Sequence, residues 1–127
     1  MKELTKAEEQ VMQYVWKLDK AFLKDIVEQF PEPRPAYTTV STVIRVLVKK
    51  GFIKFNTYGK VNQYYPGIRK NEYSRFYFRG MMKSFFNNST SKFASFFSKD
   101  EDVSLTELEE MKQILEDQIQ KRKANDK

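Results

Sequence analysis

The chain has 127 residues, 23 of them basic and 17 acidic, which gives a formal net charge of +6. Cysteine and histidine are both absent, which excludes disulfides, a thiol nucleophile, thiolate metal sites and the usual proton shuttle of neutral-pH enzymes. No apolar run approaches the roughly 20 residues that span a bilayer, and the chain starts with an amphipathic segment, so we expect a cytoplasmic protein without stable membrane association.

The first two predicted helices cover residues 5–18 and about 22–30. Thr5 and Glu8 have the spacing of a capping box, in which each side chain accepts a hydrogen bond from the backbone of the other. Apolar residues follow at helical intervals in both segments. Prolines then prevent the second helix from continuing and predict an extended connector, at Pro31, Pro33 and Pro35.

Residues 37–50 are ambiguous on residue preference alone, because many of them are β-branched and would suit a strand. The run is long for a strand, and Lys49-Lys50-Gly51 is a typical end of a helix. Apolar residues also recur at helical spacing, at Val40, Val43, Ile44 and Leu47. A third helix is therefore predicted.

Two short strands follow, at 52–55 and 62–65, around a turn at 56–60 in which Gly59 supplies the positive φ. Three helices followed by a β-hairpin predict a winged helix-turn-helix. The fold class is therefore mainly α with a small β-hairpin, and we assign residues 1–68 to a winged-helix DNA-binding domain.

Residues 69–127 are predicted to be a helical dimerisation domain. An aromatic helix covers about 71–86, a short segment 90–98 follows, and a second capping box at Ser104 and Glu107 starts a long helix. One isolated helix cannot hide this much apolar surface, so we expect a core shared in a homodimer; an aromatic ligand pocket is the alternative. The residues predicted for this interface are Tyr73, Phe76, Tyr77, Met81, Phe85, Leu108, Met111, Leu115 and Ile119.

Charge is distributed unevenly along the chain. Between Glu32 and Asp100 the only acid is Glu72, whereas basic residues recur throughout this window. A long window so poor in acids indicates a polyanionic partner. Residues 99–127 instead hold nine acids and six bases, which favours contact with protein rather than phosphate.

The polar face of the third helix is the predicted DNA-reading surface. Short hydroxyl side chains approach bases and phosphates closely, and an arginine can reach guanine in the major groove. The predicted contacts are Thr38, Thr39, Ser41, Thr42, Arg45 and Lys49 on the helix, with Lys54, Tyr58 and Lys60 on the wing. The alternative interpretation is an ordinary solvated helix face and an exposed turn, in a winged-helix module that binds protein.

No catalytic arrangement is predicted. Asp100-Glu101-Asp102 lacks the spacing and the glycine of a calcium loop, and it favours the start of the following helix electrostatically. A small hydrolase that uses these acids with lysines is a remote alternative, because nothing assembles a site. We therefore expect no enzyme activity, no cofactor and no metal.

The stretch from Tyr37 to Ile44, continued by Leu47 and Lys50-Gly51-Phe52-Ile53, closely resembles the recognition helix of the penicillinase repressor (BlaI/MecI-type) family. Residues 4–8 with Val11-Met12 and Trp16 resemble its first helix, and Gln63-Tyr64-Tyr65 its second wing strand. The resemblance runs from about residue 4 to 122.

The resemblance implies a homodimeric transcriptional repressor bound to a palindromic operator in double-stranded DNA, controlling antibiotic-resistance or stress genes. Inducible members are released when a membrane β-lactam sensor triggers cleavage of an Asn-Phe bond in the C-terminal domain. The aligned pair here is Ser95-Phe96. Many members have arginine where this chain has Val46, with Arg45 one place earlier. Copper-sensing relatives use C-terminal cysteines, which this chain lacks.

Overall fold

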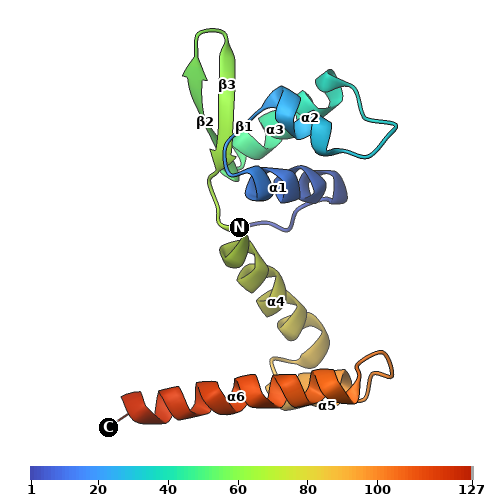
Figure 1. The fold of residues 1–127 in the computed structure, drawn as a ribbon, viewed down its shortest axis with the longest axis vertical. Coiled ribbons are helices and arrows are strands. Elements are labelled where there is room, and N and C mark those ends of the chain that lie inside the picture. The colour runs from blue at the N-terminus through green and yellow to red at the C-terminus, as the bar shows by residue number, and fades with distance from the viewer. Residues whose placement is uncertain (127) are drawn as a thin grey trace. The chain divides into compact units, whose positions relative to one another are not determined.

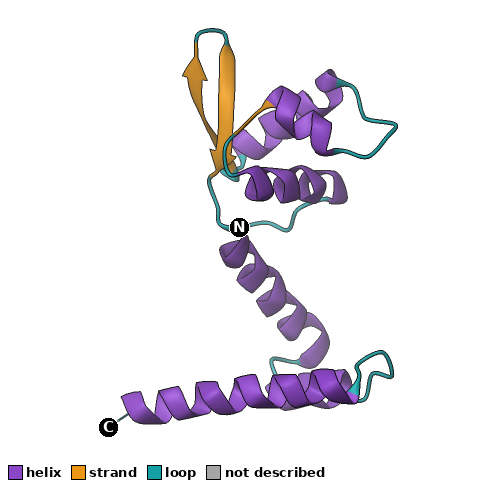
Figure 2. Cartoon of the chain, in the orientation of Figure 1, coloured by secondary structure: helices purple, strands orange, loops and turns teal. Residues whose placement is uncertain are grey.

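The computed structural model describes residues 1–126 (Figures 1 and 2). Its contacts divide the chain into two compact units, Met1–Phe78 and the remainder from Arg79 onward. The elements are, in order, α1 (Lys6–Leu18), β1 (Ala21–Phe22), α2 (Leu23–Gln29), α3 (Tyr37–Lys49), β2 (Ile53–Tyr58), β3 (Val61–Pro66), α4 (Lys70–Phe86), α5 (Thr90–Ser98) and α6 (Leu105–Asn125).

Helix α1 begins with the predicted capping box. The Glu8 amide donates to Thr5 Oγ1 at 3.2 Å, and the Thr5 amide donates to Glu8 Oε1 at 2.9 Å. Both bonds satisfy backbone donors that the first turn of a helix leaves unpaired. The start of α1 is therefore determined locally, and the prediction is confirmed.

Strand β1 was not predicted from the sequence. Its two residues pair antiparallel with β3, so that the described residues form a three-stranded sheet in the order β1-β3-β2. The Asp25 carboxylate accepts a hydrogen bond from the Phe22 amide at 2.9 Å, and α2 starts at Leu23. A strand of two residues is too short for an alternating pattern to reveal it.

Helix α3 confirms that hydrophobic spacing outweighs β-branched preference here. Val40, Ile44 and Leu47 are buried, as the spacing predicts. The helix ends where expected: Gly51 has a φ of +84°, and the Phe52 amide donates to the Leu47 carbonyl at 2.9 Å. Phe52 is thereby directed into the core, and β2 starts immediately after it.

The hairpin is longer than predicted, and its turn is shorter. The prediction of a loop at 56–60 is wrong, because β2 continues to Tyr58 and β3 begins at Val61. Only Gly59 and Lys60 form the turn, with a φ of +62° at Gly59. Polar residues continue the ladder because they pair across it: Thr57 Oγ1 lies 2.8 Å from Asn62 Oδ1.

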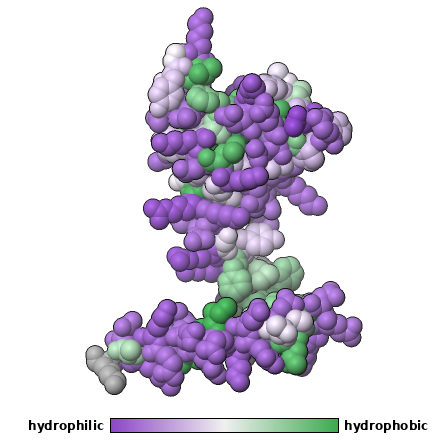
Figure 3. All heavy atoms as spheres, viewed as in Figure 1, coloured by the Kyte–Doolittle hydropathy of each residue, from purple (hydrophilic) through white to green (hydrophobic). Residues whose placement is uncertain are grey.

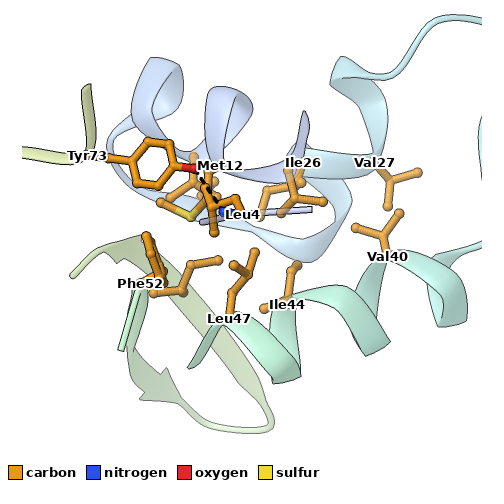
Figure 4. Close-up of a cluster of buried hydrophobic side chains, with 13 residues drawn as sticks. Leu4, Met12, Ile26, Val27, Val40, Ile44, Leu47, Phe52 and Tyr73 are labelled. Carbon is orange, nitrogen blue, oxygen red and sulfur yellow. Dashed lines mark hydrogen bonds between the residues drawn. The ribbon is translucent and has the colours of Figure 1, made fainter. Parts of the chain in front are cut away.

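The first unit packs its helices and the base of the sheet around one hydrophobic core, and Figure 4 shows how these side chains converge. The residues labelled there are Leu4, Met12, Ile26, Val27, Val40, Ile44, Leu47, Phe52 and Tyr73. Helices α1–α3 followed by the β2–β3 hairpin are the winged helix-turn-helix that the sequence predicts.

The start of α4 belongs to this core. The Leu4 amide donates to Tyr73 Oη at 2.9 Å, and Trp16 Nε1 donates to the Ile68 carbonyl at 2.8 Å. Tyr73, predicted from the sequence to lie in the dimer interface, is buried within the single chain. Its ring lies against Phe52 and Trp16, because the chain turns back onto α1 after the wing. The first unit accordingly runs past the predicted boundary at residue 68.

Tyr73→Phe should destabilise the first unit by about 1–3 kcal/mol, because it leaves the buried Leu4 amide without an acceptor. Urea unfolding followed by circular dichroism measures the change. Tyr37→Phe is the matched control. Because Tyr37 is exposed, removing its hydroxyl should change the free energy of unfolding by less than about 0.5 kcal/mol. Equal stability of the Tyr73→Phe variant and the parent protein would show that this hydrogen bond contributes nothing.

The second unit has little interior. Asn87 and Asn88 adopt positive φ and separate α4 from α5, while Ser89 and Ser104 cap the two helices that come after them. Phe86 lies against rings of α5, at 5.4 Å from Phe93 between centroids. Helix α6 has no buried residue within its described length. None of the helices among residues 1–126 combines the length and the apolar character that a membrane span requires.

Candidate nucleic-acid interface

Helix α3 carries a strip of exposed polar side chains along one face. Thr38, Thr42, Arg45 and Lys49 are all exposed and succeed one another at intervals of three or four residues. Helical geometry therefore brings four of the six predicted contacts together. The Arg45 guanidinium has no hydrogen-bond or ion-pair partner among residues 1–126, so it is available to a ligand.

The other two predicted helix contacts lie beside this strip. Ser41 is half-buried on one flank. Thr39 is exposed about a quarter-turn away, where it borders a groove of about 390 Å³ with the prolines of the connector. The exposed strip therefore contains fewer residues than the set of helix contacts that the sequence predicts.

The N-terminus of α3 leaves its backbone amides open. Ala36 precedes the helix and provides no side-chain cap, and the first turn contains no acid. Unpaired amides and the positive end of the helix dipole favour a phosphate at such a position. The strip thus begins at a backbone site suited to an anion.

The wing holds the remaining predicted contacts. Lys54 and Tyr58 alternate with Phe55 and Thr57 along β2 and share one face of the hairpin, whereas Lys60 lies in the turn. All three are exposed, and none of them makes an ion pair within the part of the chain that the structure describes. The charges of Lys54 and Lys60 remain available to a polyanion.

Lys50, in contrast, is neutralised within the fold. Its Nζ lies 2.7 Å from Glu8 Oε2, and Glu8 is only 5% exposed. Burial raises the pKa of the Glu8 carboxyl, but the hydrogen bond from Lys50 and those with Thr5 lower it by more, so the pKa lies below its ordinary value of 4.5. This pair links the start of α1 to the junction of α3 and β2. Sequence spacing did not reveal it, because the partners are 42 positions apart.

Acid should destabilise the first unit through Glu8. Because the native pKa is lowered, the carboxylate contributes stability that is fully present above the unfolded value of 4.5 and is lost as the pH falls through the native pKa. Glu8→Gln should therefore lose less unfolding free energy than the parent protein between about pH 6 and about pH 3. Urea unfolding at each pH measures this difference. Glu9→Gln, at an exposed neighbouring site, is the control, and an identical acid response in Glu8→Gln and the parent would contradict the assignment.

The predicted interface residues of the second unit are largely uncovered. Phe85 is 79% exposed and Leu115 58%, while Met81 and Leu108 are half-buried. Hydrophobic side chains reach the surface among polar ones, as the green atoms in Figure 3 show. Leu105 and Ile114 are two further exposed apolar residues of α6, and the sequence pattern did not single out Ile114.

The predicted cleavage pair lies inside a helix. Ser95 and Phe96 are both exposed and belong to α5. The Ser95 carbonyl accepts a hydrogen bond from Ser98 Oγ at 3.2 Å. A protease that requires extended substrate would therefore need this helix to open.

The sequence model of the family described as "Penicillinase repressor" matches residues 4–117. The Penicillinase repressor of Bacillus licheniformis is 24% identical over 95% of this chain and 95% of its own length. The methicillin resistance regulatory protein MecI of Mammaliicoccus sciuri is 28% identical over 89% of this chain and 93% of its own. The solved DNA-binding domain of the repressor BlaI is 26% identical over 57% of this chain and 94% of that domain, with a TM-score of 0.49.

The match with the family extends over both units, from Leu4 in the first core into the middle of α6. It includes the helix whose exposed polar strip and open N-terminus suit a nucleic acid. It also includes the wing and the uncovered apolar helices. The chain therefore belongs to the penicillinase repressor family, whose members are DNA-binding repressors of transcription.

Proposed function

We propose that this chain acts as a homodimer that binds a palindromic operator in double-stranded DNA and represses transcription. The observation that carries the proposal is the exposed strip on α3, which ends in the unpartnered Arg45 and Lys49 and belongs to a surface poor in acids. A polyanion binds to such a strip with little internal competition.

In this proposal α3 lies in the major groove. Thr38, Thr42 and Arg45 contact base edges, with Thr39 and Ser41 at the flanks of the strip. Lys49, Lys54 and Lys60 contact phosphates, and Tyr58 lies along the DNA backbone beside the wing. Residues 1–68 form the DNA-binding domain, and the docked first turns of α4 connect it to the dimerisation domain.

Within the predicted dimerisation domain at 69–127, the part beyond the docked first turns of α4 joins two copies of the chain. A two-fold dimer places one α3 in each half of a palindrome, with half-site centres about one helical turn or a multiple of it apart, roughly 34–36 Å per turn. The exposed apolar residues of α6 and the end of α4 supply the contact.

The operator controls antibiotic-resistance or stress genes, and repression ends when a pathway that starts at a membrane sensor leads to cleavage at Ser95-Phe96. The exposure of this pair supports access, and its helical setting makes the opening of α5 the first step. Cleavage there would separate α6 from the winged helix and remove the apolar surface of α6 that we assign to the dimer.

Selection of bound fragments from a random duplex library tests the proposed function, with the preferred sequence then titrated at two salt concentrations. We expect a palindrome that binds far more tightly than scrambled DNA and whose affinity falls steeply with salt. Absence of any enriched sequence would contradict the proposal. It would favour a winged-helix module that binds protein instead.

A further inference from the structure

Val46 is an apolar residue on the side of α3 that faces solvent. It is 41% exposed and lies outside the hydrophobic core of the first unit. Its backbone carbonyl accepts the Lys50 amide at 3.0 Å, a role that any residue could fill. The valine side chain is therefore needed neither for the core nor for the end of the helix.

Thr42 lies one helical turn before Val46, so the two side chains are neighbours on the helix surface. The Thr42 hydroxyl donates to the Thr38 carbonyl at 2.9 Å. Its one proton is thereby used within the helix, and the side chain cannot also donate to a base. The γ-methyl and the oxygen lone pairs are the groups that Thr42 has left to offer.

We infer that the Thr42 γ-methyl and the Val46 methyls form an apolar ridge that recognises thymine through its C5-methyl group. Thymine alone among the four bases presents a methyl in the major groove, and threonine methyls and other small apolar groups contact it. This inference rests on the proposed function, because it requires α3 to lie in the major groove.

The ridge shares Thr42 with the polar strip of the same helix. Arg45 and Lys49 lie on one side of it and are suited to guanine and to phosphate. A half-site read by both surfaces must therefore contain thymine beside the guanine that Arg45 contacts. The ridge gives α3 a preference for thymine that its charged side chains cannot supply, because a charged group does not distinguish a base with a methyl from one without it.

The test uses the intact chain, the preferred operator from the selection, and operators in which single thymines are replaced by deoxyuridine, which lacks only the methyl. Replacing a contacted thymine should weaken binding by about fourfold, the effect of one buried methyl. Thr42→Ser should weaken binding to the thymine operator by a similar factor. The affinity of the Thr42→Ser variant should then hardly change when deoxyuridine replaces thymine at the contacted position, because serine has no γ-methyl. The affinity of the Thr42→Val variant should still fall there, because valine keeps this methyl. Val46→Ala should lose sensitivity at an adjacent thymine.

Thr106→Ser, an exposed change of the same chemistry in α6, is the matched control and should bind both operators as the parent protein does. Circular dichroism confirms that each variant is folded. A preferred operator that lacks thymine in its half-sites, or whose affinity ignores deoxyuridine, would overturn the ridge but leave the proposed function intact. An equal loss of deoxyuridine sensitivity in Thr42→Val and Thr42→Ser would also overturn it. Failure to enrich any sequence would overturn the proposed function, and the ridge with it.

Discussion

Leu115→Glu should convert the proposed dimer to a monomer and lower the affinity for an operator with two half-sites by about 10²–10⁴-fold, because the copy bound at one half-site then no longer tethers a second copy to the other. Leu115 is exposed at 58% in the middle of α6, which buries none of its residues within one chain. A carboxylate at this position would have to be buried without a partner in the dimer, at a large cost in free energy.

Two measurements separate this effect from a loss of DNA contacts. Light scattering after size exclusion reports the mass, and titration of a single half-site reports the intrinsic affinity, which should not change. Gln113→Glu is the matched control, because the helical period places Gln113 on the opposite side of α6 from Leu115. A dimeric Leu115→Glu variant, or a Gln113→Glu variant that is also monomeric, would refute the proposed interface.

The elements that could be predicted from the sequence are those whose signals are local. The capping boxes at Thr5 and Ser104 determine where α1 and α6 begin, because both partners lie within four residues. The spacing of Val40, Ile44 and Leu47 predicts α3 against its β-branched composition, since burial of one face contributes more than intrinsic preference. Four of the predicted contacts then share a face by helical geometry alone.

The features that could not be predicted depend on contacts between distant residues. Tyr73 has the same aromatic spacing as its neighbours in α4, and nothing local distinguishes the one that hydrogen-bonds to Leu4. Lys50 and Lys49 are adjacent and chemically identical, yet only Lys50 reaches a buried carboxylate. The extent of the wing depends on cross-strand pairs such as Thr57 with Asn62, which exist only once the register is set.

Arg45→Ala should weaken binding to the preferred operator by about 1–3 kcal/mol, roughly 5- to 150-fold, and relax the preference at one base pair. The guanidinium is exposed on the strip and makes no bond within residues 1–126, so its removal should leave the fold intact. A bidentate contact to guanine would explain both the loss and its restriction to one position, since the two acceptors O6 and N7 match the fork of arginine.

Lys60→Ala should behave differently from Arg45→Ala. Lys60 lies in the turn of the wing, and with α3 in the major groove it contacts phosphate and no base. It should weaken binding to preferred and scrambled DNA alike and reduce the slope of log affinity against log salt by about 1. Titration of both variants on both sequences at several salt concentrations distinguishes the two roles. If Arg45→Ala lost affinity equally on preferred and scrambled DNA, Arg45 would be a phosphate contact, and the reading of guanine would have to be assigned to another residue of the strip.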